Sequence, residues 1–298
     1  MNEVAKESRI LSNQGCPDGQ SPPAETLGLA KSLLSAHHAE WAAKRYRQQI
    51  EMARVQERSR SLLLSRVRAE PAERSQLDEE WRSVIAQRIE GLERVRQPGG
   101  GPVLPDVETF PRAGITLAVP PYDFDWVSGN RRAVEHADRM TGKYALRVQS
   151  LGNGQRTAAA GIGFWFFSGA GNPAQRFSAL LDYSHAWFDS ASFYVAHNNQ
   201  HTRLWVFGAS EKTWVAQSDV TPSWSDGVGW LDSHGNDPEG EEGRVSNETY
   251  FNAAPNSWYQ CWIWSEADVY GDSGFWGFAA SSTRLNISVP FAVLGSLG

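Results

Sequence analysis

The sequence has little of what marks exported, membrane-spanning or disulfide-stabilised proteins. Its 298 residues include only two cysteines, Cys16 and Cys261, and residues 1–20 contain no apolar stretch of the kind found in secretory signals. No run approaches the ~20 apolar residues that cross a bilayer. These absences predict neither a disulfide framework nor a transmembrane segment and favour the cytoplasm by default. Export by a route that needs no N-terminal signal stays open.

Positive charge is also scarce. The formal net charge is −6, from 28 Lys and Arg against 34 Asp and Glu. Residues 1–106 hold 16 basic and 15 acidic residues, whereas residues 107–298 hold 12 and 19, a balance of 12 − 19 = −7. A nucleic-acid-binding protein normally carries a basic field. No nucleic-acid partner is therefore expected.

Several catalytic and cofactor motifs are missing. The chain has no Gly-x-x-x-x-Gly-Lys phosphate loop, no Gly-x-Ser-x-Gly elbow, no dinucleotide fingerprint and no Cys-x-x-Cys pair. Enzyme classes that depend on these motifs are not indicated, and no cofactor is expected.

The front third of the chain predicts long helices. Residues 1–20 read as a polar tail, and Ser21-Pro22-Pro23 is a typical helix start. From Ala24 to about Arg68 there is no proline and a single glycine, so we expect a helix of roughly 45 residues, about 65 Å long.

A heptad seam can be traced along this helix. Its spacing alternates between three and four residues, as in a coiled coil, and its first half is rich in alanine. The seam residues with an expected role in oligomerisation are Leu29, Ala36, Ala39, Ala43, Tyr46, Ile50, Ala53 and Leu64.

A second helix is expected over about residues 72–97, after Pro71. Its apolar stripe includes Leu77, Trp81, Ile85, Ile89 and Leu92. The two helices predict an antiparallel hairpin arm over residues 21–97, and two helices alone make a poor core. We therefore expect the arm to pack against another copy or against the second domain.

A Pro/Gly linker over residues 98–106 separates the arm from residues 107–298. This second part has short runs rich in Phe, Trp, Tyr and Val between turn residues. Ten candidate strands fit this part, among them residues 275–281 and 285–294, and residues 174–181 are expected to form a short helical turn. The pattern predicts a Trp-rich antiparallel β-sandwich that is jelly-roll-like, and hence an α+β multidomain chain.

The stretch Trp258–Val269 is the most informative strand. Side chains of a strand alternate between two faces. The odd positions form a mostly apolar face of ordinary core size. The even positions form a row of indoles that leads into two carboxylates, and they are the candidate binding residues: Trp258, Gln260, Trp262, Trp264, Glu266 and Asp268. This second face is either a second core, a protein interface or a sugar-binding surface.

Glu266 and Asp268 are also weak candidates for catalysis. Paired carboxylates perform glycoside hydrolysis, and β-sandwich hydrolases of the laminarinase type carry Glu-x-Asp followed by a third Glu on one strand. Here the third Glu is missing, so the resemblance is partial.

Two further groups of polar residues are interpreted without a metal. The acidic, glycine-rich segment around Asp232, Asn236, Asp237 and Glu239 contains oxygen ligands that Ca²⁺ accepts, but its spacing does not match an EF-hand, and a solvated loop is favoured. His197 and His201 lie in a segment read as the end of a strand and a turn. No third zinc ligand can be named there.

These observations favour a non-enzymatic structural or interaction protein, in which a helical arm oligomerises or docks a β-sandwich body. The partner is then a second copy of the chain or a larger assembly. The alternative is a carbohydrate-binding sandwich with a glycan partner, and a weaker alternative is a glycoside hydrolase.

Overall fold

The structure is a computed structural model of the chain. It describes residues 21–68, 115–130, 133–152, 154–169, 173–191, 195–229, 232–235, 241–271, 273–274 and 277–296.

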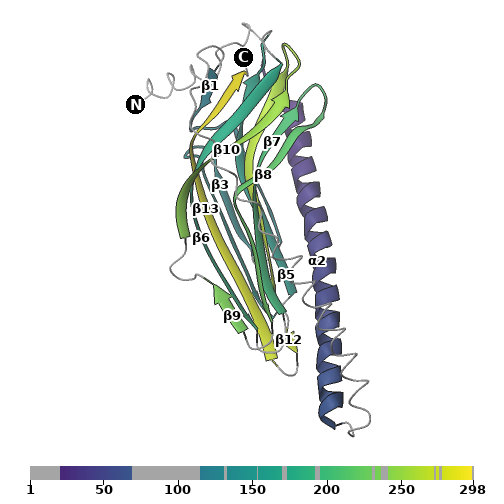
Figure 1. Ribbon diagram of the computed structural model, residues 1–298. Helices are drawn as coiled ribbons and strands as arrows, with labels where there is room; N and C mark the ends of the chain where they lie inside the picture. Colours follow the sequence, from purple (N-terminus) through teal and green to yellow (C-terminus); the bar gives the residue numbers. More distant parts are fainter. Residues whose placement is uncertain are drawn as a thin grey trace.

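The expected long helix is confirmed. Helix α2 spans Ala24–Arg68 and contains 45 residues. It begins directly after Pro22-Pro23, and the backbone N–H of Thr26 donates to the Pro23 carbonyl oxygen at 3.0 Å. The C-terminal end of α2 extends past the end of the sheets where β12 lies (Figure 1).

The rest of the described chain is antiparallel β-structure. The strands are β1 Ile115–Ala118, β2 Phe124–Gly129, β3 Val134–Asp138, β4 Lys143–Leu151, β5 Gly154–Phe167, β6 Ala174–Ala191, β7 Val195–Gly208, β8 Thr213–Gly229, β9 Asp232–Gly235, β10 Glu241–Asn252, β11 Trp258–Gly271, β12 Ser273–Gly274 and β13 Gly277–Ser296. They form a β-sandwich of two sheets, which agrees with the predicted body.

The first sheet has eight strands with the main order β10-β6-β13-β4-β3; in addition, β1 and β12 pair with β13, and β9 pairs with β6. The second has five strands in the order β2-β5-β11-β7-β8. Consecutive long strands repeatedly change sheet, as β5, β6 and β7 do. Alternate residues of both sheets therefore meet in one core.

The core between the sheets is apolar, as strand alternation predicts. The odd residues of β11, with Tyr259, Cys261 and Ile263 fully buried, face this core. They pack against the other sheet through buried side chains that include Tyr144, Leu146, Val148, Phe177, Leu181, Leu285 and Ile287.

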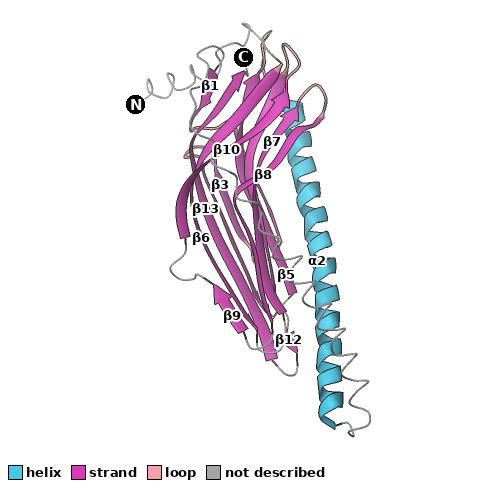
Figure 2. Ribbon diagram, viewed as in Figure 1, coloured by secondary structure: helices cyan, strands magenta, loops and turns pink. Residues whose placement is uncertain are grey.

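Helix α2 forms a third layer. It lies lengthwise along the five-stranded sheet, on the side away from the eight-stranded sheet (Figure 2). Contacts join it to β11, β7, β2 and β5. Of the two neighbours expected for the predicted arm, α2 therefore packs on the second part of the same chain.

Three details of the expected architecture were wrong. Residues 174–181 form the first part of strand β6 and not a helical turn, because Gln175, Phe177, Ala179 and Leu181 alternate into the sandwich. The strand expected over residues 275–281, as far as it is described from Gly277 on, and the strand expected separately over residues 285–294 are one continuous strand β13. The segment around His197 and His201 is the interior of strand β7 and not a turn.

The helical hairpin is not shown, because the described residues contain one helix. The second helix predicted over residues 72–97, with Leu77, Trp81, Ile85, Ile89 and Leu92, lies outside the described residues. So do the predicted tail, residues 1–20, and the predicted linker, residues 98–106. Within the part described, no helix combines the length and apolar character needed to cross a membrane.

Candidate functional site

The candidate site is the outer face of the five-stranded sheet, which lies directly beneath α2. The even residues of β11 point to this side, as expected from their alternation. Trp262, Trp264, Glu266 and Asp268 are fully buried, and Trp258 is 9% exposed. The indole and carboxylate row is therefore a second core and not an open surface in this structure.

Small residues on β5 make room for the indoles. Gly161 and Gly163 lie opposite Trp264 and Trp262 in the sheet register. A Cβ atom on Gly161 would lie 2.3 Å from the Trp264 Cβ, and one on Gly163 would lie 2.2 Å from the Phe124 ring. Only glycine allows the bulky side chains of the neighbouring strands to lie flat across β5.

Helix α2 presents a row of side chains that matches this face in polarity. The row advances mostly by three or four residues per step, as one side of a helix does. Its buried or half-buried members are Thr26, Ala30, Leu34, His37, His38, Trp41, Arg45 and Gln49.

The polarity changes along the helix in step with the strand. Ala30 and Leu34 pack with Trp262 and Trp264 in one apolar cluster. Farther along, Arg45 and Gln49 meet Asp268. The order from indole to carboxylate on β11 is thus repeated as apolar to polar on α2.

Glu266 belongs to a cluster centred on Arg203 of β7. The Arg203 guanidinium donates to Glu266 Oε1, and its Nε donates to Asp219 Oδ1 at 2.6 Å. The same guanidinium lies 4.9 Å from the centroid of the Trp264 ring, in cation–π geometry. Arg203 is only 6% exposed, so its charge is balanced inside the protein.

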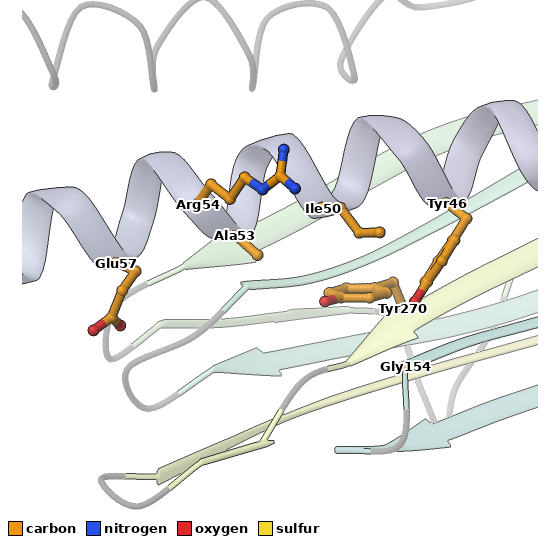
Figure 3. A pocket seen from close by; sticks show the side chains of 7 residues that line it. All are labelled: Tyr46, Ile50, Ala53, Arg54, Glu57, Gly154 and Tyr270. Carbon is orange, nitrogen blue, oxygen red and sulfur yellow. The ribbon is translucent and has the colours of Figure 1, made fainter.

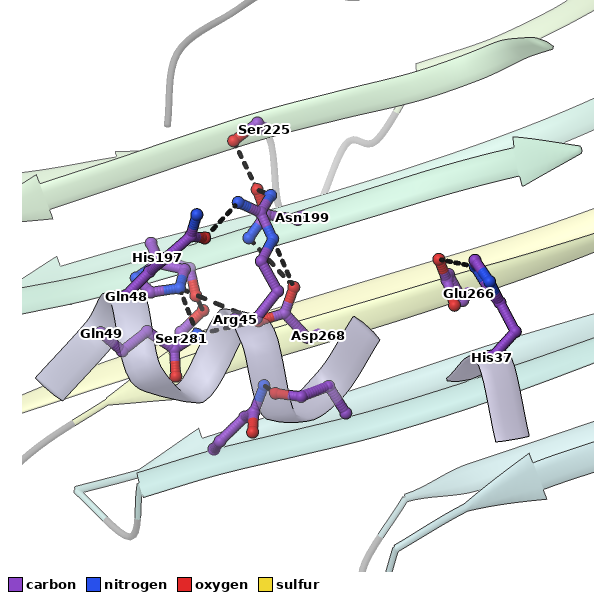
Figure 4. Close-up of polar contacts among 12 residues, drawn as sticks. His37, Arg45, Gln48, Gln49, His197, Asn199, Ser225, Glu266, Asp268 and Ser281 are labelled. Atoms are coloured by element: carbon purple, nitrogen blue, oxygen red, sulfur yellow. Dashed lines mark hydrogen bonds and ion pairs between the residues drawn. The ribbon is translucent and has the colours of Figure 1, made fainter. Parts of the chain in front are cut away.

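His37 of α2 lies beside Glu266 (Figure 4) and completes the Arg203 cluster as a neutral side chain. Arg203 Nη1 lies 2.9 Å from His37 Nε2. Because arginine only donates, this nitrogen of His37 must be the acceptor. The pKa of His37 is lowered by burial and by the Arg203 charge. The 4.0 Å contact between His37 and Glu266 is therefore not an ion pair.

Asp268 is held by two strands and the helix together (Figure 4). Asn199 Nδ2 donates to its Oδ1 at 3.0 Å, and Gln49 Nε2 donates to its Oδ2 at 2.9 Å. Arg45 Nε lies 3.8 Å from Oδ1, and the Arg45 guanidinium also donates to Asn199 Oδ1. Gln155 of β5 adds a further hydrogen bond, so groups from β5, β7 and α2 fix this buried carboxylate.

His197 lies in the same cluster in its neutral form. Gln49 Nε2 is 2.6 Å from His197 Nε2 and is the donor, so this ring nitrogen accepts. Burial lowers the pKa of His197 to about 3. The 3.8 Å contact with Asp268 is therefore a contact between a neutral ring and a carboxyl group.

Burial changes the acidity of both carboxyl groups. It raises the pKa of Glu266 to about 8, against the opposing effect of Arg203. It also raises the pKa of Asp268, against Arg45, Asn199 and Gln49. A glycosidase needs two carboxyl groups with pKa values pushed apart and a path for the substrate. Here both values move upward and α2 covers both groups.

Several polar atoms in this layer have no hydrogen-bond partner among the described residues. They are His38 Nε2, Arg45 Nε, Gln49 Oε1, His197 Nδ1, Trp205 Nε1, Trp264 Nε1 and Glu266 Oε2. Buried polar groups are normally satisfied. Five of these atoms belong to polar side chains, and the other two are indole nitrogens of the apolar cluster.

The predicted oligomerisation seam lies on the other side of α2. Leu29, Ala36, Ala39, Ala43 and Tyr46 are exposed, and Leu29 and Tyr46 are 38% and 46% exposed. Leu64 is 45% exposed, and Ile50 and Ala53 are half-buried. The described residues bring no element onto the seam between Leu29 and Ala43, whereas Tyr46, Ile50 and Ala53 line a hollow beside the sheet.

A hollow of about 400 Å³ lies where the C-terminal half of α2 passes the end of β11. In Figure 3 the side chains of Tyr46 and Ile50 point from the helix toward Tyr270 of the sheet. Ala53, Arg54, Glu57 and Gly154 complete the lining. Ile50 and Ala53, expected in the seam, thus contribute to this hollow.

The calcium candidates are mostly outside the described residues. Asp232 begins strand β9, and Asn236, Asp237 and Glu239 lie in the undescribed stretch that follows. Within the described ranges, no group of three or more His, Cys, Asp or Glu side chains is arranged to hold a metal ion.

Sequence reasoning missed most partners of the two carboxylates. Arg203, Asn199 and His197 share one face of β7, and the period of two would have shown this had the strand been read through to residue 195. The register of β7 against β11 places Asn199 opposite Asp268 and Arg203 opposite Trp264. The helix partners Arg45 and Gln49 had no local signal.

No protein-family model and no curated protein matches the sequence. Among solved structures, TmCBM61, determined in complex with beta-1,4-galactotriose, is 12% identical with a TM-score of 0.17; the match covers 58% of this chain and 88% of that one. The enzymatically active domain of bacteriophage CBA120 tailspike protein 4 is 12% identical with a TM-score of 0.17, over 59% of this chain and 19% of that one.

A structure of infectious bursal disease virus, Gx strain, is 11% identical with a TM-score of 0.19, over 58% of this chain and 36% of the viral chain. At these TM-scores the likenesses carry no argument about function.

Proposed function

We propose that this chain is a non-enzymatic assembly protein, in which a jelly-roll-like sandwich carries α2 as a third layer and presents the opposite side of α2 to a second copy of the chain. The observation that carries the proposal is the division of α2 into two sides. One side is buried on the sheet, and the other leaves the seam from Leu29 to Ala43 exposed.

The seam has the composition that a helix–helix contact needs. Ala36, Ala39 and Ala43 are small, so two helices can approach closely, and Leu29 adds apolar area at one end. A soluble helix normally turns its apolar residues inward. Here residues with coiled-coil spacing point away from the sheet.

The buried polar half of the α2 interface gives the helix one position on the sheet. Glu266 and Asp268 contact side chains of α2 that are four to twelve residues apart, His37, Arg45 and Gln49. A shift of α2 by one turn, about 5.4 Å, would separate these groups and leave Asp268 without two of its partners. Specific positioning is a known use of buried polar groups.

The experiment is the mass of the intact chain by light scattering across a concentration series. A monomer has a mass of 33.0 kDa. We expect a multiple of this mass for the natural sequence and a monomer for the double variant Ala39→Glu, Ala43→Glu. The matched control is Lys44→Glu, which changes the net charge by the same −2 at an exposed position beside the seam.

Circular dichroism identifies whether each variant is folded. A natural chain that remains a monomer at every concentration would refute the proposal. If the Lys44→Glu variant dissociates to a monomer as fully as the double variant does, the effect comes from charge alone. That result would also refute the proposal that the seam joins two copies of the chain.

The two alternatives both need α2 to leave the sheet. Carbohydrate binding through Trp262 and Trp264, or hydrolysis by Glu266 and Asp268, requires side chains that are fully buried here to meet a substrate. Binding of a neutral oligosaccharide that Trp262→Ala abolishes without loss of fold would favour the first alternative over the assembly role. An activity abolished by Glu266→Gln would favour the second.

A further inference from the structure

The outer face of the eight-stranded sheet contains two arginines side by side. Arg284 of β13 lies directly opposite Arg147 of β4 in the antiparallel register. Both side chains are exposed. Side chains in such positions have Cβ atoms about 4.5–5.5 Å apart, and like charges placed this way destabilise a sheet.

Neither guanidinium has an ion pair or a hydrogen bond within the part of the chain that the structure describes. The nearest carboxylates in the register of this face are Asp138, opposite Lys143, and Asp182, opposite Ser288. Each is four residues along its strand pair from the arginines, or about 13 Å.

The nearby carboxylates are also engaged or distant. Asp182 accepts from Arg244, with Nε–Oδ1 and Nη2–Oδ2 distances of 2.5 and 3.0 Å. Asp138 accepts from Thr141 and from the Met140 N–H. Glu242 shares this face but lies on β10, two strands from Arg284. The arginine pair therefore has an excess of positive charge on a chain with net charge −6.

The residues around the pair are neutral and suited to hydrogen bonding. Gln149 and Ser282 form the neighbouring row on one side, and Asn286 lies on the other side. Asn286 Nδ2 donates to Ser184 Oγ at 3.1 Å, which leaves its carbonyl oxygen for another donor. Phe188, opposite Ser282, is 38% exposed and adds an aromatic ring to the row.

We propose that this platform, defined as Arg147, Arg284, Gln149, Ser282, Asn286 and Phe188, binds an acidic oligosaccharide. Guanidinium groups pair with carboxylate and sulfate oxygens in a bidentate geometry. The amides and the hydroxyl match sugar hydroxyls, and the phenyl ring matches the apolar face of a pyranose.

This choice of ligand follows from charge and composition. A neutral glycan makes no use of two opposed cations. A nucleic acid needs several phosphate contacts, and the surrounding chain is acidic. The proposal goes beyond the assembly role and is independent of it, because the platform lies on the sheet that α2 does not cover.

The test is calorimetric titration of the full chain with three hexasaccharides at low salt. Heparin hexasaccharide carries sulfate and carboxylate, hyaluronan hexasaccharide carries carboxylate alone, and chitohexaose is neutral. We expect binding of at least one acidic probe, which identifies the anion, and none of chitohexaose. Each of Arg147→Gln and Arg284→Gln should weaken binding roughly 10- to 100-fold, as for loss of a charged hydrogen bond, and the lysine variants should recover part of it.

The matched control is Arg244→Gln, on the same sheet face but already paired with Asp182. It should change the affinity by less than about twofold, because the charge of Arg244 is already balanced by Asp182 in an exposed ion pair. The proposal is overturned if the folded chain binds neither acidic probe, if chitohexaose binds equally well, or if Arg244→Gln weakens binding as much as Arg284→Gln.

A second measurement examines the premise without any ligand. If the two arginines repel each other, Arg284→Gln should raise the melting temperature of the free protein at low ionic strength, and added salt should reduce the difference. A lower melting temperature for this variant would show that the pair is not repulsive and would remove the basis of the proposal.

Discussion

The buried carboxyl group of Glu266 gives this protein a testable dependence of stability on pH. Its pKa is raised from 4.5 to about 8, mainly because burial disfavours the charged form. A carboxyl group whose pKa is higher in the folded state retains a proton that the unfolded chain releases. Stability is therefore highest below the unfolded value and falls as the pH rises toward 8.

The magnitude follows from the two pKa values. At 1.36 kcal/mol for each pKa unit, the full difference between 4.5 and about 8 corresponds to roughly 5 kcal/mol. Between pH 6.5 and pH 8.5 the ionisation of Glu266 lowers the free energy of unfolding of the natural chain by roughly 2 kcal/mol. This window is chosen because the pKa values of His38, His197 and His201, lowered by burial to about 4, 3 and 4, lie below it.

The perturbation is Glu266→Gln. Glutamine keeps the shape and an oxygen that accepts from Arg203, so it imitates the protonated carboxyl group. We expect the variant to exceed the free energy of unfolding of the natural chain by roughly 3 kcal/mol at pH 6.5 and by roughly 5 kcal/mol at pH 8.5, so that the gap widens by roughly 2 kcal/mol over this range. The control is Asp189→Asn, which removes another buried carboxyl group with a raised pKa in a different part of the core. This control should keep the loss of stability with pH that comes from Glu266.

The assay is urea unfolding followed by tryptophan fluorescence at pH 6.5, 7.5 and 8.5 and constant ionic strength. Trp264, which stacks against Arg203, reports directly on the cluster. The reasoning is refuted if the natural chain and Glu266→Gln lose the same free energy over this range. It is also refuted if Glu266→Gln is several kcal/mol less stable already at pH 6.5, because that result would mean an ionised, paired carboxylate.

Three more results are expected. Arg45→Met should destabilise the fold by about 3–5 kcal/mol in denaturant titrations, because Asp268 would lose its cation while remaining buried; no change would mean that α2 is not docked there. Gly161→Ala should lower the melting temperature, because its Cβ would lie 2.3 Å from the Trp264 Cβ. Gly28→Ala, with nothing within 4 Å, should stabilise the helix by about 0.5–1 kcal/mol. A higher melting temperature for Gly161→Ala than for Gly28→Ala would contradict the packing. In a Cys16→Ser background, Cys261 should react with a thiol reagent only as fast as the fold opens, because burial raises the pKa of its thiol, and rapid labelling would show an open core.

Much of the architecture could be predicted from local patterns. The helix from Ala24 to about Arg68 followed from the absence of breakers, and the two faces of Trp258–Val269 followed from alternation. Strand ends were less well predicted. Polar residues such as Asn198 and Asn199 suggested a turn, but the sheets on both sides supply their hydrogen bonds, so β7 continues through them.

The candidate site was predicted only in part. Its β11 residues were named correctly as one row, but whether that row is open or buried depends on α2. The side of α2 that docks is mixed in polarity, with Ala30 and Leu34 followed by Arg45 and Gln49, so it has no apolar periodicity. The more regular apolar seam, with Leu29 and Ala43, drew attention to the opposite side.

The sequence by itself determined the elements and the chemistry of each of their faces, because helix and strand periods depend only on the backbone. Tertiary structure decided which faces meet. The indoles, Glu266 and Asp268 are enclosed because α2 carries His37, Arg45 and Gln49 at the spacing their register requires. In the same way, the register of β13 against β4 placed Arg284 beside Arg147, two residues 137 positions apart in the chain that no local pattern connects.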